Sequence, residues 1–203
     1  MAIELKKGSK VNLNKVENKS LGEILINLNW EQKQQKPKGL FGRILSAPNK
    51  NVDLDLGCLY QLKNGKIGCI QALGNAFGTL NREPYVKLDA DDRTGLNKLG
   101  ENLRVNGDSI KDIERILIYS FIYAGVANWS ETNGIVTLNQ IDGPDLVVKL
   151  DECKNGYNMC AIAMITNEND ETFAIEKIVR YFKGHSDMDI AFKWGLRWSA
   201  GSK

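Results

Sequence analysis

The chain has 203 residues, of which 42% are hydrophobic and 26% are charged, and its formal net charge is +2 at pH 7. This composition is typical of a globular protein, and the near balance of charges excludes a strongly basic nucleic-acid-binding module. No apolar run reaches the roughly 18 residues that a membrane-spanning helix requires, and the first residues lack the apolar stretch of a secretory signal. We therefore expect a cytoplasmic protein that does not cross a membrane.

Short apolar segments that alternate with polar residues and end in turn residues predict β-strands along most of the chain. The segment 24–30 alternates in this way, and Asn64 with Gly65 marks a hairpin turn because both residues tolerate positive φ angles. The segment 116–123 is apolar on both faces, which predicts a central strand buried on both sides. The other predicted strands and hairpin arms lie at 11–16, 53–60, 61–70, 135–138, 146–150, 160–165 and 175–182.

Helix signals are few. Ser109 is a candidate cap for a short helical turn over 109–116, and residues 187–194 fit either a short helix or a last strand. No long amphipathic helix is present, which argues against alternating βαβ units. The spacing of the strands instead predicts an all-β fold, a β-sandwich of two antiparallel sheets that forms a single domain over residues 1–203.

The segment 31–50 interrupts this pattern because it carries five cationic residues and only one acid. A small group of apolar residues, among them Leu40 and Phe41, lies between the cations. We predict an exposed basic loop. Two interpretations stay open, namely a contact for a protein partner or an anionic membrane, and a mobile loop with a small local apolar cluster.

Residues for covalent or acid–base catalysis are scarce, so we predict that the protein is not an enzyme. The single histidine, His185, has no nucleophile-elbow motif to accompany it, and no P-loop motif is present. The four cysteines at 58, 69, 153 and 160 lack zinc-site spacing and are expected to be buried or half-buried thiols. Reduction of an oxyanion by Cys58 is disfavoured because Asp55 makes its surroundings anionic.

Two acidic stretches are the candidates for a functional site. Asp53 and Asp55 should lie about 7 Å apart on one face of a strand, while the leucines that alternate with them face the core. The stretch 89–95 contributes three more aspartates, and the sequence Gly-Glu-Asn follows at 100–102. Such oxygen donors suit Ca²⁺, but the spacing is not that of an EF-hand. A metal site and a solvated acidic loop therefore both remain open.

A second hypothesis uses the same carboxylates for a different purpose. Paired carboxylates about 5–10 Å apart can hydrolyse glycosides, and Trp129, Trp194 and Trp198 could stack on sugar rings. In this alternative the protein is a carbohydrate-binding or glycoside-processing β-sandwich. The competing interpretation of the tryptophans is packing in the core.

Several short motifs spread over the chain match one known family. They are Asp-Leu-Asp-Leu at 53–56, Asp-Asp-Arg-Thr-Gly at 91–95 and Gly-Glu-Asn at 100–102, with further matches at 5–13, 24–30, 71–75, 127–129, 160–163 and 194–198. On these motifs the chain resembles the TerD-domain family of tellurite-resistance and general stress proteins, and it is more similar to the TerA branch of that family. The combination of the first two motifs is the specific part of the match.

The resemblance implies a β-sandwich that binds Ca²⁺ through acidic loops at one edge, with no catalytic residues to carry over. The metal ligands that it assigns are Asp53, Asp55, Asp91, Asp92, Glu101 and Asn102. It further implies a scaffold or sensor role in resistance to tellurite and other stresses, with other tellurite-resistance proteins as partners in a complex near the inner face of the membrane. The chain departs from the family at 96–99, where Leu-Asn-Lys-Leu stands in place of an acidic run. This departure implies a lower affinity or the loss of one of two metal positions.

Overall fold

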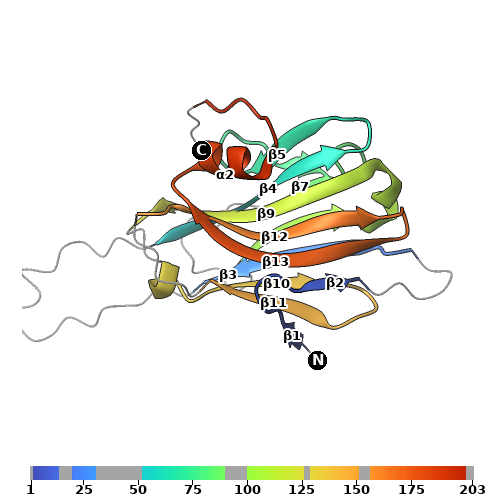
Figure 1. Ribbon diagram of the computed structural model, residues 1–203, viewed down its shortest axis with the longest axis horizontal. Helices are drawn as coiled ribbons and strands as arrows, with labels where there is room; N and C mark the ends of the chain where they lie inside the picture. Colours follow the sequence, from blue (N-terminus) through green and yellow to red (C-terminus); the bar gives the residue numbers. More distant parts are fainter. Residues whose placement is uncertain are drawn as a thin grey trace, which may run out of the picture.

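Two β-sheets pack face to face in the computed structural model, which describes residues 2–13, 20–30, 52–89, 100–125, 129–150 and 156–199 (Figure 1). This arrangement confirms the all-β sandwich that the strand pattern predicts. No helix in these ranges is long and apolar enough to cross a membrane.

The first sheet has seven strands in the order β1-β11-β10-β3-β8-β7-β6. They are β1 (Ala2–Glu4), β11 (Asp145–Leu150), β10 (Gly134–Asn139), β3 (Glu23–Asn29), β8 (Glu101–Asn106), β7 (Val86–Leu88) and β6 (Gly78–Thr79). Neighbouring strands are antiparallel except for the parallel pair of β1 and β11. Because β3 joins β8 to β10, strands from both halves of the sequence build this sheet.

The second sheet has six strands in the order β2-β13-β12-β9-β4-β5, all antiparallel. They are β2 (Lys10–Asn12), β13 (Thr172–Phe182), β12 (Met159–Glu168), β9 (Ile113–Ala124), β4 (Asp53–Leu62) and β5 (Ile67–Gln71). Strand β5 pairs only with residues 57–61 of β4. The first residues of β4 therefore have no β5 partner, a feature that matters for the site below.

The core lies between the two sheets and follows from the period-two alternation of the strands. Ile24, Ile26 and Leu28 of β3 are fully buried there, and Leu54 and Leu56 of β4 reach it from the opposite sheet. The side chains between them point to the outer faces. Alternation in the sequence thus decides which face of each strand meets the core.

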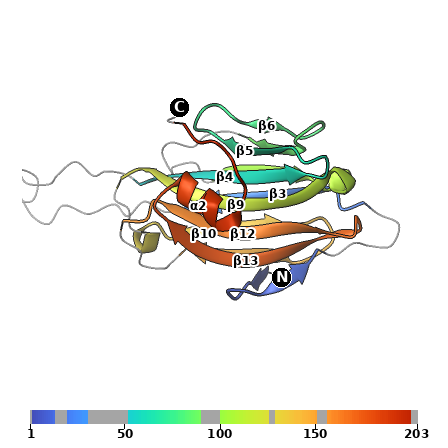
Figure 2. The ribbon, with the colours of Figure 1, turned by 45° about the horizontal axis from the view of Figure 1, so that its top comes forward.

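Strand β9 is buried on both faces, as its sequence predicts. Ile116 and Ile118 belong to the core between the sheets, whereas Leu117 and Tyr119 belong to a second apolar cluster on the outer face of the six-stranded sheet. Helix α2 (His185–Phe192) covers this second cluster (Figure 2). The ambiguous segment near 187–194 is therefore mainly a helix.

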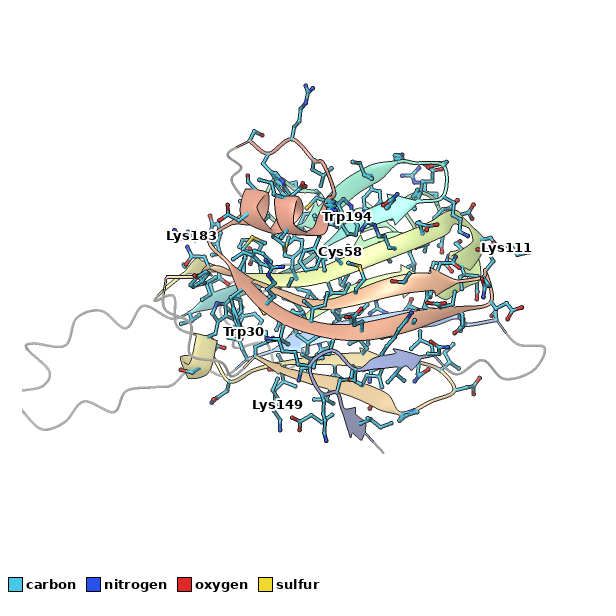
Figure 3. All side chains as sticks on the ribbon, in the orientation of Figure 1. Trp30, Cys58, Lys111, Lys149, Lys183 and Trp194 are labelled. Atoms are coloured by element: carbon cyan, nitrogen blue, oxygen red, sulfur yellow. The ribbon has the colours of Figure 1, made fainter. Side chains whose placement is uncertain are left out.

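The carboxy-terminal segment continues the cover that α2 begins. Trp194 is 4% exposed, lies over the six-stranded sheet (Figure 3), and donates its Nε1–H to the carbonyl of Tyr60 at 3.0 Å. The Asp189 carboxylate accepts hydrogen bonds from the backbone N–H groups of Gly195 (2.8 Å) and Leu196 (3.0 Å). These bonds hold the segment against the sheet, and the burial of Trp194 matches the core-packing interpretation.

Some predicted boundaries differ from the structure. The 3-10 helix η1 (Gly107–Asp112) ends earlier than the turn expected over 109–116, so β9 begins at Ile113. A second 3-10 helix, η2, spans Trp129–Glu131. The sequence pattern does not predict strands β7 and β8, because β7 is only three residues long and both strands flank an acidic stretch with the composition of a loop. The basic segment 31–50 lies outside the described residues.

Candidate functional site

Two acids of β4 lie on the outer side of the six-stranded sheet, near the open part of the strand edge. The alternation that sends Leu54 and Leu56 into the core sends Asp53 and Asp55 to the other side. Asp53 is 6% exposed and Asp55 is 0% exposed. Two carboxylates that are adjacent on one face of a strand are thus almost completely withdrawn from water.

A third buried acid, from the other sheet, bonds to the backbone of β4. Glu101 begins β8, is 1% exposed, and shares the inward-facing side of β8 with Leu103. Its Oε2 accepts the backbone N–H of Leu56 at 2.6 Å, so it bonds to β4 next to Asp55. This charge-assisted hydrogen bond lies where β4 has no β5 partner, and it joins two segments that are 45 residues apart.

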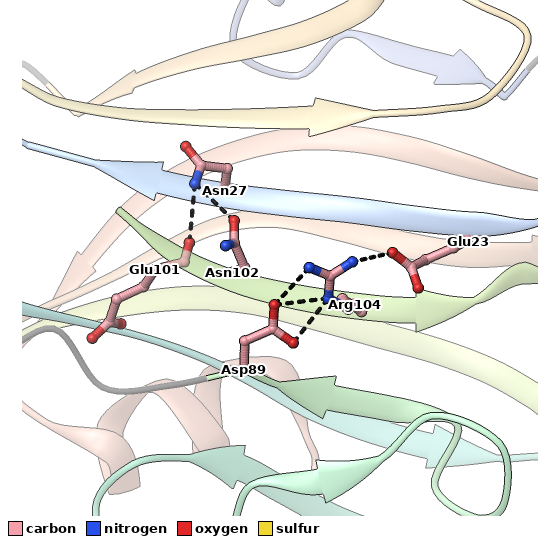
Figure 4. Close-up of polar contacts among 6 residues, drawn as sticks. All are labelled: Glu23, Asn27, Asp89, Glu101, Asn102 and Arg104. Atoms are coloured by element: carbon pink, nitrogen blue, oxygen red, sulfur yellow. Dashed lines mark hydrogen bonds and ion pairs between the residues drawn. The ribbon is translucent and has the colours of Figure 1, made fainter. Parts of the chain in front are cut away.

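Asn102 follows Glu101 in β8, and its side chain therefore lies on the opposite face of the seven-stranded sheet. Its Oδ1 accepts a hydrogen bond from Nδ2 of Asn27 at 2.8 Å (Figure 4). The Glu101 carboxylate extends away from this pair of amides in the same view. Glu101 therefore bonds to the backbone of β4 beside Asp55, whereas the Asn102 carboxamide is directed at Asn27.

The acidic stretch 90–99, with Asp91 and Asp92, lies outside the described residues, but both of its ends are described. The backbone N–H of Asp89 donates to the carbonyl of Asn102 at 2.9 Å. The Asp89 carboxylate accepts from Nε of Arg104 at 2.7 and 2.8 Å, and Arg104 also pairs with Glu23 (Figure 4). The bond to Asp89 first, and that to Glu23, raise the pKa of Arg104 above its ordinary value. Asp89 is therefore engaged by an arginine rather than directed at the buried acids.

Gly100 sets the entry into β8. Its φ angle is +64°, and a Cβ at this position would lie 2.1 Å from the Leu28 carbonyl oxygen. Only glycine fits both the backbone conformation and this close approach to β3. The residue before Glu101 thus fixes where the acidic stretch joins the seven-stranded sheet.

A chain of hydrogen bonds lies on the same outer face as the β4 acids. Tyr119 donates to Oε1 of Gln71 at 2.7 Å, His185 Nε2 lies 2.9 Å from the same oxygen, and Cys69 Sγ lies 3.0 Å from the Tyr119 hydroxyl. Burial raises the pKa of Tyr119 well above its usual value, and Asp55 is a smaller cause of the same shift. No motif in the sequence indicates that His185 contributes to this chain of hydrogen bonds.

The thiols and the histidine are poorly suited to catalysis in this setting. Burial raises the pKa of Cys69 to about 12 and that of Cys58 well above its ordinary value, so both remain protonated near neutral pH. Burial lowers the pKa of His185 to about 4. These shifts fit structural roles, although Cys58 and Cys69 do lie on the paired strands β4 and β5.

The glycoside hypothesis gains no support from this geometry. The burial of Asp53 and Asp55 withdraws this particular pair of carboxylates from a sugar that approaches from solvent. Trp129 is 0% exposed with its Nε1–H donated to the carbonyl of Tyr157 at 2.7 Å, and Trp194 is buried under the carboxy-terminal segment. Both tryptophans pack in the interior instead of offering a face to a ring.

The donor set fits a hard divalent cation in its chemistry. Asp53, Asp55 and Glu101 supply carboxylate oxygens, the ligands that Ca²⁺ takes in sets of six to eight. Among the residues that the structure describes, no group of three or more His, Cys, Asp and Glu side chains could hold a metal ion by itself. A complete site on this edge would therefore need further ligands from 90–99.

Comparison with known proteins places the chain in a family. The family described as "TerD domain" matches residues 1–139, a range that contains all six predicted ligands. The chain belongs to the TerD domain family. The tellurium resistance protein TerA of an Alcaligenes species is 47% identical over 184 residues, which cover 91% of this chain. The chain spans about half, 53%, of the length of that relative.

Two solved structures share the TerD-domain fold. A protein of unknown function superposes with a TM-score of 0.58 at 10% identity, covering 88% of this chain and 100% of its own. A homologue of telluride resistance protein (TerD) from Streptomyces coelicolor superposes with a TM-score of 0.56 at 15% identity, covering 83% and 95%. The sandwich also includes β11, β12 and β13, which follow the matched range 1–139.

Proposed function

We propose that this chain takes part in tellurium resistance as a non-enzymatic calcium-binding β-sandwich that acts as a scaffold or sensor. Membership of the TerD domain family and the 47% identity to TerA support the resistance role. The observation that supports the calcium part is the near-complete burial of Asp53 and Asp55 on β4, next to Leu56, whose backbone N–H bonds to the buried Glu101 carboxylate of the other sheet.

The physical argument starts from the cost of burying charge. An ionised carboxylate inside a protein is unfavourable unless hydrogen bonds and a counter-charge compensate for lost hydration. In this proposal a divalent cation supplies the counter-charge for Asp53, Asp55 and Glu101, which the bond from Glu101 to the Leu56 backbone links to the same strand. In this proposal Asp91 and Asp92, which follow Asp89 in sequence, complete the ligand set. The carboxamide of Asn102 bonds to Asn27, so the proposal rests on the carboxylates.

A scaffold or sensor role follows from where these carboxylates come from. Glu101 belongs to the seven-stranded sheet and the two aspartates to the six-stranded sheet, so one ion would tie the sheets together at this edge. Ion binding would then change the stability of the sandwich rather than drive a reaction. As partners we propose other tellurite-resistance proteins, in a cytoplasmic complex that lies peripherally at the inner face of the membrane.

Thermal unfolding in Ca²⁺ and in chelator tests the calcium part. We expect Ca²⁺ to raise the melting temperature, because a ligand that binds only the folded state stabilises it by mass action. The double variant Asp53→Asn with Asp91→Asn should lose this rise. Asp112→Asn with Asp187→Asn makes the same change of charge elsewhere and should keep it. Identical melting curves for the unmodified chain in Ca²⁺ and in chelator would refute the calcium site and leave the family membership intact.

A further inference from the structure

A hollow of about 610 Å³ lies on the outer face of the seven-stranded sheet. Lys149, one of its lining residues, lies on the side of the molecule away from Trp194 (Figure 3). Its floor comes from β3, β10 and β11, and none of its lining residues belongs to the candidate metal site. A volume of this size is within the range of small-molecule sites in proteins, roughly 300–1,000 Å³. The hollow is therefore large enough for an organic ligand.

The floor of the hollow is polar because of the register between strands. Asn27 and Asn29 of β3 pair with Thr137 and Ile135 of β10, and Ile135 pairs with Lys149 of β11. Their neighbours along each strand fill the core, so these side chains all point outward. The register thus lays two carboxamides and a hydroxyl side by side, with one apolar side chain among them.

One of these amides is oriented by a neighbour outside the hollow. Nδ2 of Asn27 donates to Oδ1 of Asn102 on the β8 side, at 2.8 Å. Its carboxamide oxygen consequently points to the other side of β3, toward β10 (Figure 4). The pairing with Asn102 therefore presents an acceptor, in a fixed orientation, to the floor of the hollow.

The turn at one end of the hollow is held in an unusual conformation. Asn133 has a φ angle of +48°, and the fully buried Thr132 before it bonds to the Trp129 carbonyl (2.8 Å) and accepts the backbone N–H of Gly134 (3.1 Å). Asparagine tolerates left-handed backbone in turns better than most residues other than glycine do. Here it places a third carboxamide at the wall of the hollow.

The charge of the hollow is balanced. Lys149 is its one charged lining residue in the described part of the chain, and its Nζ lies 2.7 Å from Oε2 of Glu4 on β1. A cation already paired with a carboxylate offers little net attraction to an anion. Trp30 lines the end wall but is only 3% exposed, so it offers no open ring for stacking a base.

We propose that this hollow binds a neutral polyhydroxylated molecule, a ligand with the chemistry of a sugar. Each hydroxyl of such a ligand both donates and accepts, and carboxamides and the threonine hydroxyl match it in both directions. The exposed face of Ile135 would contact its C–H groups. This binding role is independent of the proposed calcium site, and it uses none of the carboxylates of the glycoside hypothesis.

Two-dimensional NMR of the full ¹⁵N-labelled chain tests the proposal with a panel of common monosaccharides, with potassium phosphate and adenosine as comparison probes. We expect at least one sugar to give saturable shifts in the side-chain amide signals of Asn27, Asn29 and Asn133. Asn133→Gly should weaken binding about three- to tenfold through the loss of one hydrogen-bonding group. Glycine accepts a positive φ angle, so this variant should fold normally.

A matched control is Asn75→Gly, because Asn75 also has a positive φ angle (+56°) but lies on an exposed turn outside the hollow. It should leave the affinity unchanged. The proposal is overturned if no monosaccharide shifts these signals, or if phosphate or adenosine shifts them and the sugars do not. Equal weakening by both asparagine variants would overturn it as well.

Discussion

The two outer faces of the sandwich differ in both composition and cover. The outer face of the six-stranded sheet carries Leu117, Tyr119 and Phe121, and α2 with the carboxy-terminal segment lies over it. The outer face of the seven-stranded sheet carries polar side chains, such as Asn27 and Thr137, at the outward-facing positions of its strands. No α-helix of the described chain lies over this face. The difference indicates that the covered face contributes to stability by burying apolar side chains, whereas the outer face of the seven-stranded sheet is the one on which we propose a binding site.

The largest expected effect is on the covered face. Trp194→Ala should lower the free energy of unfolding by about 3–5 kcal/mol, because it leaves a cavity under the carboxy-terminal segment and removes the bond to Tyr60. Denaturant unfolding measures this change. Ile190→Ala, on the same helix-turn unit but at a side chain that is 75% exposed, should change stability by no more than about 0.5 kcal/mol. If both variants lower the free energy of unfolding by the same small amount, the carboxy-terminal segment does not stabilise the fold.

A smaller effect on the same face should depend on pH. Burial lowers the pKa of His185 to about 4, below the value near 6.5 of an unfolded chain. The unfolded state therefore binds the proton first, so this contribution to stability is complete above about pH 6.5 and is lost as the pH falls toward 4. Denaturant unfolding across this window should show a shallower decline for His185→Gln, which keeps a neutral hydrogen-bonding side chain.

The carboxylates titrate in both proteins, so the difference between the two curves isolates the histidine. The ring centroids of His185 and Trp198 lie 4.7 Å apart. If the stability of the unmodified chain and of His185→Gln declines equally with falling pH, His185 does not stay neutral in this packed position.

The smallest effect is expected on the uncovered face. Thr137→Val keeps the shape of a side chain that lines the hollow, and valine is favoured in strands, so the free energy of unfolding should change by less than about 0.5 kcal/mol. Equilibrium unfolding measures it. A loss of more than about 2 kcal/mol would show that the polar face is as structural as the apolar one and would remove the contrast between the two faces.

Much of the candidate site could be anticipated from local pattern and family motifs, but its geometry could not. The alternation around Asp53 and Asp55 correctly separates the acids from the leucines of β4. From its sequence, the stretch that contains Glu101 and Asn102 is predicted to be a loop, because the acidic residues before it obscure the alternating pattern of β8. Once β8 forms, the pleat sends these two neighbours to opposite faces, and only Glu101 meets β4.

The sequence by itself determined the sandwich and the family. The alternation of apolar and polar residues in a strand is a local property, and each family motif is a short contiguous stretch of residues that can be recognised without the structure. The double-sided apolar pattern of β9 also required that something cover its outer face. Only the tertiary structure decided what that cover is, which acid crosses between the sheets, and which amides line the hollow. Each of these depends on pairing between residues far apart in the chain, where register and sheet order, rather than local composition, set the distances.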